Sequence, residues 1–463
     1  MTPAATETEA VELTDLTNLA ESGQRQKLRL VLNDLHPADL AVMLTEMQDD
    51  HRLSCFRLLD LDHASEVLSE LDTEVQANLL RSLGDIGIVS LISRMSPNDA
   101  VDLLAELPEE KASAIISQIP DSEAKEDLEE LMKFEQDTAG GIMSTDYLSV
   151  FARMTSGEAL LHLRDMYEDL EEDIYDIYVV DETNGLVGHL GVKELITADP
   201  MLLVADVMDT TVVSVKTSTD QEEAAETLGH YDLLSLPVID EFGKLRGIIM
   251  ADDIIDVLKE EANEDAFQSS GISSPGGDSQ EMLGHNVGKA FGARLPWLIA
   301  TLMIETGAAT VITHYDSVIR DTVAAASFMP LLSGVTGSVA TQSTCIIIRG
   351  TKDRNSLNTK LMVKNLFHEI KVGLLLAVLC GACTFLISML FNHSHPQLGI
   401  IVSASLILTM TVGVVIGTIM PMFFQKIGID PAHASGPLIT SILDVSTMTI
   451  YLTIVHFFRA SLT

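Results

Sequence analysis

Five long apolar runs in the C-terminal part of the chain are the feature that most constrains its fold. Each run is near or above the ~20 residues that an α-helix needs to span a bilayer. We therefore predict a transmembrane domain of five helices at residues 293–463. The runs are Leu295–His314, Thr322–Ile348, Val372–Phe391, Leu398–Phe424 and Pro437–Phe458.

The charges between the runs predict how the helices are oriented. The segment 349–371 is rich in Lys and Arg, whereas the loop NHSHPQ between the third and fourth runs has neither. Basic residues favour the cytosolic side, so the first segment is predicted inside and the second outside. The start of the chain, MTPAATETEAVELTDL, lacks the basic start and apolar core of a signal peptide. We expect a multi-pass protein of the plasma (inner) membrane, with cytosolic N-terminal domains and an external C-terminus.

The net charge is unevenly distributed. The chain has 28 Lys+Arg and 68 Asp+Glu, a formal charge of −40. From Asn286 onward there are 11 basic and 7 acidic residues, which leaves 17 basic and 61 acidic residues, or −44, before it. Such a charge argues against a nucleic-acid partner. The four cysteines lie in apolar runs or in a helical repeat, so they suggest neither a disulfide framework nor a zinc site.

Residues 25–135 follow a tail, residues 1–24, and are predicted to form an all-α N domain of superhelical repeats. The segment HPADLAVMLTEM at His36 recurs as SPNDAVDLLAEL at Ser96. Each copy has a polar starter and apolar residues at helical spacing, and Ser96 before Pro97 is a good N-cap. Short helices of this kind stack into an array. Such an array is by itself a structural or docking module.

A second internal repeat covers residues 136–200 and 201–262. MSTDYLSV at Met143 matches MDTTVVSV at Met208, and IYVVDETNGLVGHL at Ile177 matches LPVIDEFGKLRGII at Leu236. The pair resembles tandem α/β CBS domains, which often bind adenosine nucleotides through a Gly-apolar-apolar-Ser/Thr-x-x-Asp signature. Both copies here lack the hydroxyl residue and the first also lacks the Asp. The signature for an adenine nucleotide is therefore incomplete.

Two acidic stretches lie in the CBS region, RDMYEDLEEDIYD from Arg164 and ADDIIDVLKEEANED from Ala251. On a helix, Asp253, Asp256 and Glu260 fall on one face, where like charges repel. Such a face is either solvated or binds cations. Mg²⁺ takes oxygen ligands and keeps most of its waters while touching one or two carboxylates. A connecting helix and linker, residues 263–292, then leads into the first run.

Polar residues gather in two of the apolar runs. In the second run Ser338, Thr341 and Gln342 add polarity beside Gly334 and Gly337, small residues that by themselves more often mean close helix packing than a pore. In the fifth run the polar face holds Thr440, Ser441, Asp444 and Thr447. A carboxylate at the bilayer centre costs ~2.5–3.5 kcal/mol on insertion scales. The other runs hold no Lys or Arg at comparable depth, and Glu305 is the only other acid within the runs. Asp444 therefore either stays protonated or faces water and a permeating cation, and the polar stripe favours the cation.

Three segments make a family resemblance specific. IGIDPAHASGPLITSILDVSTMTIY, RLPWLI at Arg294 and DTAGGIMSTDYLSV at Asp137 closely resemble MgtE-type magnesium channels, and the domain order is also that of the family. The resemblance implies a homodimer in membrane lipid, with a Mg²⁺ pore between the second and fifth helices on its two-fold axis. Mg²⁺ would be both substrate and regulator. No nucleophile–base constellation appears, so we do not expect an enzyme.

Matching positions give the residue roles that this resemblance implies. Asp444 corresponds to the pore carboxylate, Thr440 lies one turn before it, and Asp430 corresponds to an acid at the cytosolic mouth. In the family, high internal Mg²⁺ bridges the acidic N and CBS domains, and the connecting helix then plugs the pore. The matching sensor positions are Asp220, Glu222, Asp232, Asp253, Asp256, Glu261, Glu264 and Asp265.

The second run departs from the family pattern Gly-Asn-x-Gly-x-Gln. Ser338 replaces the Asn and Ala340 replaces the second Gly, a change that bears on selectivity and conductance. We predict a Mg²⁺-gated Mg²⁺ channel. The alternatives are a channel for Co²⁺ or Mn²⁺, a proton-coupled divalent carrier, and a membrane-bound divalent sensor that conducts little.

Overall fold

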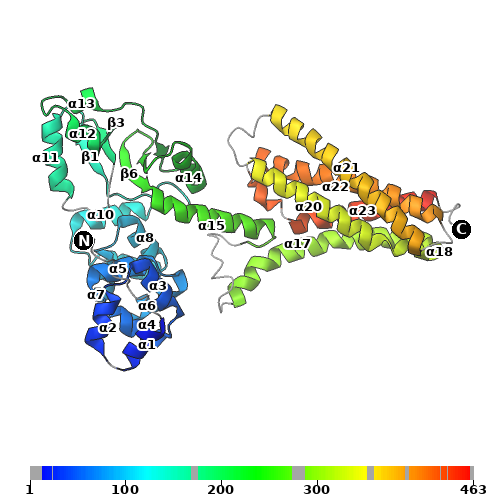
Figure 1. Ribbon diagram of the computed structural model, residues 1–463, viewed down its shortest axis with the longest axis horizontal. Coiled ribbons are helices and arrows are strands. Elements are labelled where there is room, and N and C mark those ends of the chain that lie inside the picture. The colour runs from blue at the N-terminus through cyan, green and yellow to red at the C-terminus, as the bar shows by residue number, and fades with distance from the viewer. Residues whose placement is uncertain are drawn as a thin grey trace, which may run out of the picture. The chain divides into compact units, whose positions relative to one another are not determined.

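The computed structural model describes residues 13–22, 24–167, 176–273, 287–351, 359–391, 396–427, 429–434 and 436–458. They belong to two compact units, Met1–Lys259 and Glu260–Thr463, drawn as ribbons in Figure 1. The first unit holds a helical array and two small sheets, and the second holds five helices long and apolar enough to cross a membrane. The chain is thus a multidomain membrane protein, as predicted. Most of the first acidic stretch, 168–175, and part of the predicted linker, 274–286, lie outside the described residues.

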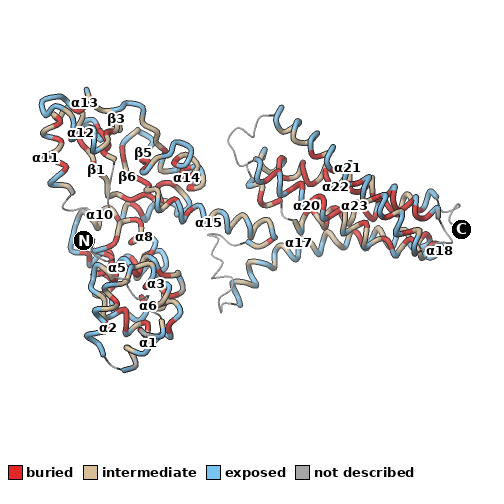
Figure 2. Tube along the Cα trace, viewed as in Figure 1, coloured by how far each residue is buried: buried red, intermediate tan, exposed pale blue. Residues whose placement is uncertain are grey.

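Short helices build the array at the start of the first unit. Their apolar residues form a continuous core, in which Leu40, Leu44, Leu68 and Leu104 are fully buried. Figure 2 colours the chain trace by burial, and buried positions recur along these helices. The helices are α1 (Leu13–Glu21), α2 (Arg25–Leu32), α3 (Pro37–Glu46), α4 (Asp49–Phe56), α5 (Leu61–Ser69), α6 (Thr73–Ser82), α7 (Asp85–Ile92), α8 (Pro97–Ala105), α9 (Glu109–Ile116) and α10 (Ser122–Leu131). Pro begins α3 and α8. At this position a backbone N–H has no acceptor within the helix, so the N–H that Pro lacks costs no hydrogen bond.

A buried cation joins two of these helices. Arg52 of α4 is only 7% exposed. Its guanidinium donates to three carbonyl oxygens at the end of α3, those of Leu44, Thr45 and Met47, at 2.7, 3.0 and 2.7 Å. The last carbonyls of a helix have no intrahelical partner, so a charged donor satisfies them where water has little access.

Two three-stranded sheets follow, one for each CBS copy. The first contains β1 (Leu148–Phe151), β2 (Asp176–Val180) and β3 (Leu186–Gly191), and the second β4 (Val215–Lys216), β5 (Ser235–Ile239) and β6 (Leu245–Met250). In each sheet the first strand pairs parallel with the second, and the second antiparallel with the third. Asn184 and Gly243 both adopt positive φ, 65° and 80°, in the turn before the third strand. Asn and Gly tolerate this left-handed conformation.

The helices of the CBS pair are α11 (Ser156–Tyr167), α12 (Val192–Thr197), α13 (Val204–Val207), α14 (Gln221–His230) and α15 (Ala251–Ser269). α15 begins directly after β6 and runs across the predicted boundary at residue 262. Residues 287–292, which the sequence assigns to the linker, belong to the next helix. Residues 263–269 of the predicted connecting segment are therefore a continuation of α15.

The second unit contains the long helices α17 (Val287–His314), α20 (Met329–Thr351), α21 (Thr359–Phe391), α22 (Pro396–Lys426) and α23 (Gly436–Phe457), with the short elements α18 (Asp316–Asp321), α19 (Val323–Ala326) and η2 (Pro431–His433). The second apolar run is thus divided between α19 and α20. The Tyr451 hydroxyl on α23 donates to the Ala325 carbonyl at 2.7 Å and holds α19 in place. α21 also begins earlier than the apolar run, so part of the basic segment 349–371 is helical.

α22 packs against α20, α21 and α23, and its glycines allow close approach. A Cβ on Gly417 would lie 2.5 Å from the carbonyl oxygen of Ala340 on α20, and Thr344 donates to the Gly417 carbonyl at 2.9 Å. Ala340, which replaces the second Gly of the family pattern, therefore lies in helix packing. α17 differs, because only 6% of its apolar window is buried.

We predict that Arg52→Ala destabilises the helical array locally by about 2 kcal/mol, because it leaves buried carbonyl groups without donors. Hydrogen exchange of the α3 and α4 amides in the intact protein should quicken accordingly. Arg94→Ala is the matched control, since Arg94 pairs with Asp62 at an exposed position and such pairs contribute little. Equal protection in both variants would contradict the role assigned to Arg52.

Candidate functional site

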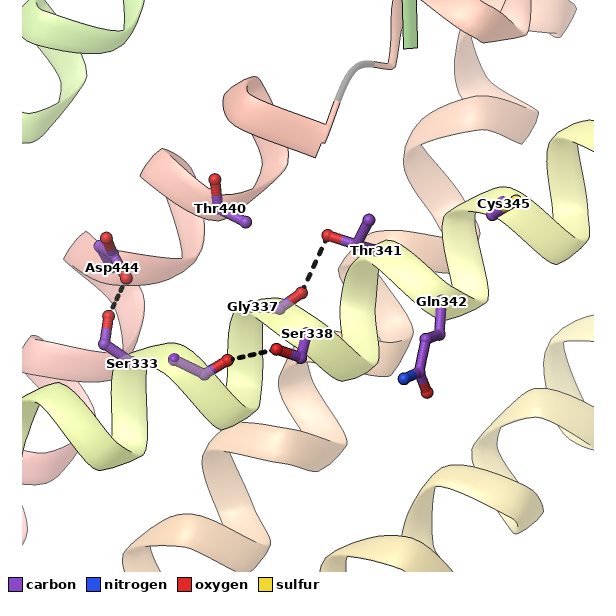
Figure 3. A pocket seen from close by; sticks show the side chains of 9 residues that line it. Ser333, Gly337, Ser338, Thr341, Gln342, Cys345, Thr440 and Asp444 are labelled. Carbon is purple, nitrogen blue, oxygen red and sulfur yellow. Dashed lines mark hydrogen bonds between the residues drawn. The ribbon is translucent and has the colours of Figure 1, made fainter. Parts of the chain in front are cut away.

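A groove lies between α20 and α23 in the second unit (Figure 3). Its volume is about 670 Å³, and it is open on one side. The lining residues are Ser333, Gly334, Gly337, Ser338, Thr341, Gln342 and Cys345 of α20 and Thr440 and Asp444 of α23. The groove thus brings together all the predicted residues of the second run and two of the four from the fifth.

Hydroxyl groups in the groove present acceptor oxygens. Ser338, Thr341 and Thr440 each donate to a carbonyl oxygen about one turn back in their own helix, at 2.8, 3.0 and 3.1 Å. A hydroxyl has a single hydrogen and two lone pairs. With the hydrogen used inside the helix, only lone pairs remain to face the groove, which suits a cation or the waters around one.

Asp444 supplies the carboxylate of the groove. The Ser333 hydroxyl on α20 donates to its Oδ1 atom across the groove (Figure 3). Glu305 of α17 lies beside the same carboxyl group. None of the ion pairs among the described residues includes Asp444. Among the described residues no basic side chain balances the charge of Asp444, and a metal ion or a proton can do so.

The remaining pore candidates lie elsewhere. Ser441 and Thr447 of α23 are buried, 5% and 1% exposed, and do not line the groove. The predicted polar stripe is thus interrupted. Ser441 directly follows Thr440 on the helix but faces away from the groove, and Thr447 is covered by neighbouring helices. Asp430 is exposed and accepts a hydrogen bond from the Ala432 N–H at 2.8 Å, which caps η2.

A second candidate site lies in the first unit, where α8 approaches the start of α15. Carboxylates of both helices interact electrostatically there: Asp99, Asp102, Asp252, Asp253 and Asp256. We call these residues the acidic cluster. The Asn98 amide donates to Asp253 Oδ1 at 3.2 Å. Asn98 Oδ1 is buried and has no hydrogen-bond partner among the described residues, so it is an acceptor without a donor beside a set of anions.

Burial strongly affects the ionisation of this cluster. Burial, together with repulsion from Asp252 and Asp99, raises the pKa of Asp253 to about 7. Burial also raises the pKa of Asp99 above its ordinary value, although hydrogen bonds with Ser96 and Ser69 lower it. Near neutral pH the cluster therefore gains a proton or a cation readily. The described residues contain no group of three or more His, Cys, Asp or Glu arranged for a metal, so a cation here would keep much of its water shell.

The sequence identified Asp253 and Asp256 but missed Asn98, Asp99 and Asp102. Their signal was present, since all three lie in the first turns of the repeat SPNDAVDLLAEL. Ser333 had no such signal, because small hydroxyl residues in membrane helices more often serve close packing.

The other predicted sensor residues lie on different elements. Asp220 precedes α14 and accepts from the Glu222 N–H at 2.9 Å, and Asp232 follows α14 with a φ of 52°. Glu261, Glu264 and Asp265 lie in the C-terminal half of α15, where Gln268 donates to Glu264 at 2.6 Å. Asp256 is exposed and pairs with Lys259 at 2.6 Å. The roles of all these residues stay predictions.

Comparison with known protein families defines the class of the chain. Residues 329–454 match the model of a divalent cation transporter, residues 35–137 the MgtE intracellular N domain and residues 204–260 a CBS domain. Together with the five apolar helices, these matches identify a multi-pass membrane transporter and not an enzyme.

Similar proteins identify the family. The chain is 34% identical over 446 residues to the magnesium transporter MgtE of Bacillus subtilis (strain 168), covering 96% of each chain. It is 33% identical over 443 residues to the magnesium transporter MgtE of Thermus thermophilus, covering 95% of this chain and 96% of the relative. The chain belongs to the MgtE family. A crystal structure of the cytosolic domain of the Mg²⁺ channel MgtE in complex with ATP covers 53% of this chain and 100% of its own, with 38% identity and a TM-score of 0.50.

The acidic cluster predicts a pH dependence. An Asp whose folded pKa is raised favours the folded contact below its ordinary pKa and weakens it as the pH rises through the folded pKa. Without divalent cations, we expect local opening of α8 to become about five- to tenfold more frequent between about pH 6 and about pH 8, roughly 1 kcal/mol. Hydrogen exchange of the α8 amides, corrected for the intrinsic rate, measures this change.

Asp253→Asn should remove most of that pH dependence, because the amide carries no charge at either pH. Asp62→Asn is the matched control at an exposed position and should keep it. A profile that is the same for Asp253→Asn and the unmodified protein would show that Asp253 does not control the contact.

Proposed function

We propose that the chain is a Mg²⁺ channel that mediates Mg²⁺ uptake as a homodimer, with the Asp444 groove as half of its pore. The observation that carries the proposal is the groove itself. Within candidate membrane helices it presents one carboxylate and a row of acceptor oxygens. The names of the MgtE relatives support Mg²⁺ as the ion.

A hydrated Mg²⁺ suits this lining. Mg²⁺ demands near-octahedral oxygen ligands and dehydrates reluctantly, so it is usually held by one or two carboxylates while keeping several waters. Coordinated waters are hydrogen-bond donors, and acceptor oxygens are their natural partners. Six waters at about 30 Å³ each occupy roughly 180 Å³, which is well below the about 670 Å³ of the groove. The groove therefore has room for the ion with most of its water shell.

A second copy of the chain would complete the pore. The groove is open on one side, and homo-oligomers most often have two-fold symmetry. On such an axis two Asp444 carboxylates face each other, and Thr440 of each subunit lines the same path. The largely uncovered α17 would contact lipid or the partner subunit. An inside-negative membrane potential would drive the cation inward, with about 2.3 kcal/mol per charge per 100 mV.

Cytosolic Mg²⁺ would close the channel through the acidic cluster. In this proposal the N and CBS domains lie in the cytosol, and the C-terminus lies on the external side of the membrane. The cluster fits a hard cation, because it gathers carboxylates that repel one another. Asn98, which contacts Asp253, adds a buried Oδ1 acceptor without a partner among the described residues. A partly hydrated Mg²⁺ would neutralise the repulsion between α8 and α15. Without it the acids repel one another and the contact weakens.

An adenine nucleotide is a second candidate regulator of the CBS pair. The ATP complex of the related cytosolic domain favours it, whereas the missing hydroxyl residues in both signature segments count against it. Calorimetric titration of the purified protein with ATP, with and without Mg²⁺, shows whether the CBS pair binds the nucleotide.

Flux measurements in liposomes discriminate among the alternative functions. The purified chain is reconstituted, and uptake of Mg²⁺, Mn²⁺, Co²⁺ and Ca²⁺ is compared with each cation present or absent on the cytosolic face. A channel for Co²⁺ or Mn²⁺ would prefer those ions. A carrier would show proton coupling and slow turnover, and a sensor would show no flux.

We predict that Asp444→Ala abolishes Mg²⁺ flux, because Asp444 is the only acid among the described residues that line the groove. The variant should still elute at the size of the folded assembly. Asp316→Ala is a suitable control, since Asp316 is paired with Arg320 outside the groove at 2.8 Å. Normal flux in Asp444→Ala would refute the pore assignment.

We predict that replacing Asp253, Asp256 and Glu261 together by Asn, Asn and Gln weakens closure by internal Mg²⁺. Fewer charges repel in the absence of the ion, and fewer ligands remain for it. The measurement is flux against the Mg²⁺ concentration on the cytosolic face. An unchanged dose response would exclude these residues from the sensor.

A further inference from the structure

The Ser333 hydroxyl is used differently from the other hydroxyls that line the groove. Ser338, Thr341 and Thr440 donate to carbonyls of their own helices, whereas Ser333 of α20 donates to Asp444 of α23 (Figure 3). This hydrogen bond joins the two helices that form the groove through the group that would meet the ion. Both side chains are half-buried, so neither is spread freely into bulk solvent.

We infer that Ser333 is a positioning residue, which fixes the direction of the Asp444 carboxylate and thereby sets the apparent affinity of the groove for the permeating cation. The inference rests on the proposed function and deepens it. It assigns to one hydroxyl of α20 an effect on transport that is exerted entirely through Asp444.

Two neighbours of Asp444 explain why its direction has to be held. An Asp side chain can choose among staggered rotamers. Glu305 of α17 lies within hydrogen-bonding reach of the carboxyl group, so Asp444 has competing partners on α17 and α20. Ser333 acts from α20, on the groove side, because it lines the groove while Glu305 does not. A single rotamer is therefore favoured before an ion arrives.

The hydrogen bond also leaves the carboxylate suited to a hydrated ion. A carboxylate has two oxygens and about four lone-pair sites, and Ser333 occupies one site on Oδ1. The remaining sites serve Glu305, which lies within reach, and the waters of a cation. Because Ser is uncharged, the donor orients Asp444 without cancelling the charge that attracts the ion. A Lys or Arg in its place would orient the carboxylate but would also cancel its charge.

The test compares Ser333→Ala with Ser333→Thr in the full-length protein in liposomes. Initial Mg²⁺ uptake is measured against external Mg²⁺, which separates the half-saturating concentration from the maximal rate. Ser333→Ala should raise the half-saturating concentration about three- to tenfold. This is the range expected when one hydrogen bond to a charged group is lost and water partly replaces the lost hydroxyl. Its maximal rate should change less than about twofold, since Asp444 remains. Ser333→Thr keeps the hydroxyl and should restore the half-saturating concentration.

Ser446→Ala is the matched control. Ser446 lies two residues from Asp444 on α23, donates to the Ile442 carbonyl of its own helix at 3.0 Å and does not line the groove. Its uptake curve should match that of the unmodified protein. An unchanged half-saturating concentration in Ser333→Ala overturns the inference, and so does a Ser333→Thr variant as impaired as Ser333→Ala, which would point to packing.

Asp444→Asn separates this inference from the proposed function. If Asp444→Asn transports Mg²⁺ normally, the proposed pore is wrong and the inference falls with it. If Asp444→Asn is inactive while Ser333→Ala behaves as the unmodified protein, the pore assignment stands and the positioning role alone is overturned.

Discussion

A carboxylate among membrane-crossing helices, with no basic partner in the described part of the chain, is the constraint on which the organisation of the second unit depends. Lipid cannot solvate that charge, so Asp444 has to face water, polar groups or another copy of the chain. The groove answers this need. Three of its hydroxyl hydrogens, those of Ser338, Thr341 and Thr440, are used within their own helices. Its glycines leave room, and its oxygen atoms face the open space. The same features that make the carboxylate tolerable also suit a hydrated cation.

The packing around α22 holds this arrangement in place. Because Gly417 has no Cβ, the backbone of α20 at Ala340 can lie close to α22. At the same place Thr344 of α20 donates a hydrogen bond to the Gly417 carbonyl. The departures from the family pattern in α20 consequently have different meanings. Ala340 is fully buried in helix packing, whereas Ser338 faces the groove. Only Ser338 therefore changes what an ion would meet, and it offers an acceptor oxygen where the family offers an amide.

The fold could be predicted from the sequence further than the sites could. Apolar runs, repeats and N-caps are local patterns, so the array, the CBS copies and the membrane helices follow from them. The site residues depend on which helices meet. Thr447 shares a helical face with Thr440, yet it is buried by neighbours that periodicity cannot reveal. Ser333 looks like an ordinary packing residue until α23 brings Asp444 to it. Asp99 and Asn98 gain their meaning only when α8 meets α15.

The acidic cluster and the groove both place carboxylates where bulk water has limited access, but the consequences are opposite. In the cluster several carboxylates oppose one another, and burial raises the pKa of Asp253 toward neutrality. A contact that depends on neutralising such charges is weak and responsive, because its stability changes with the supply of protons or cations. In the groove a single lining carboxylate accepts a hydrogen bond from a neutral donor, Ser333, and lies beside Glu305. Such a site attracts a cation but offers too few protein ligands to strip and retain it, which is what conduction requires.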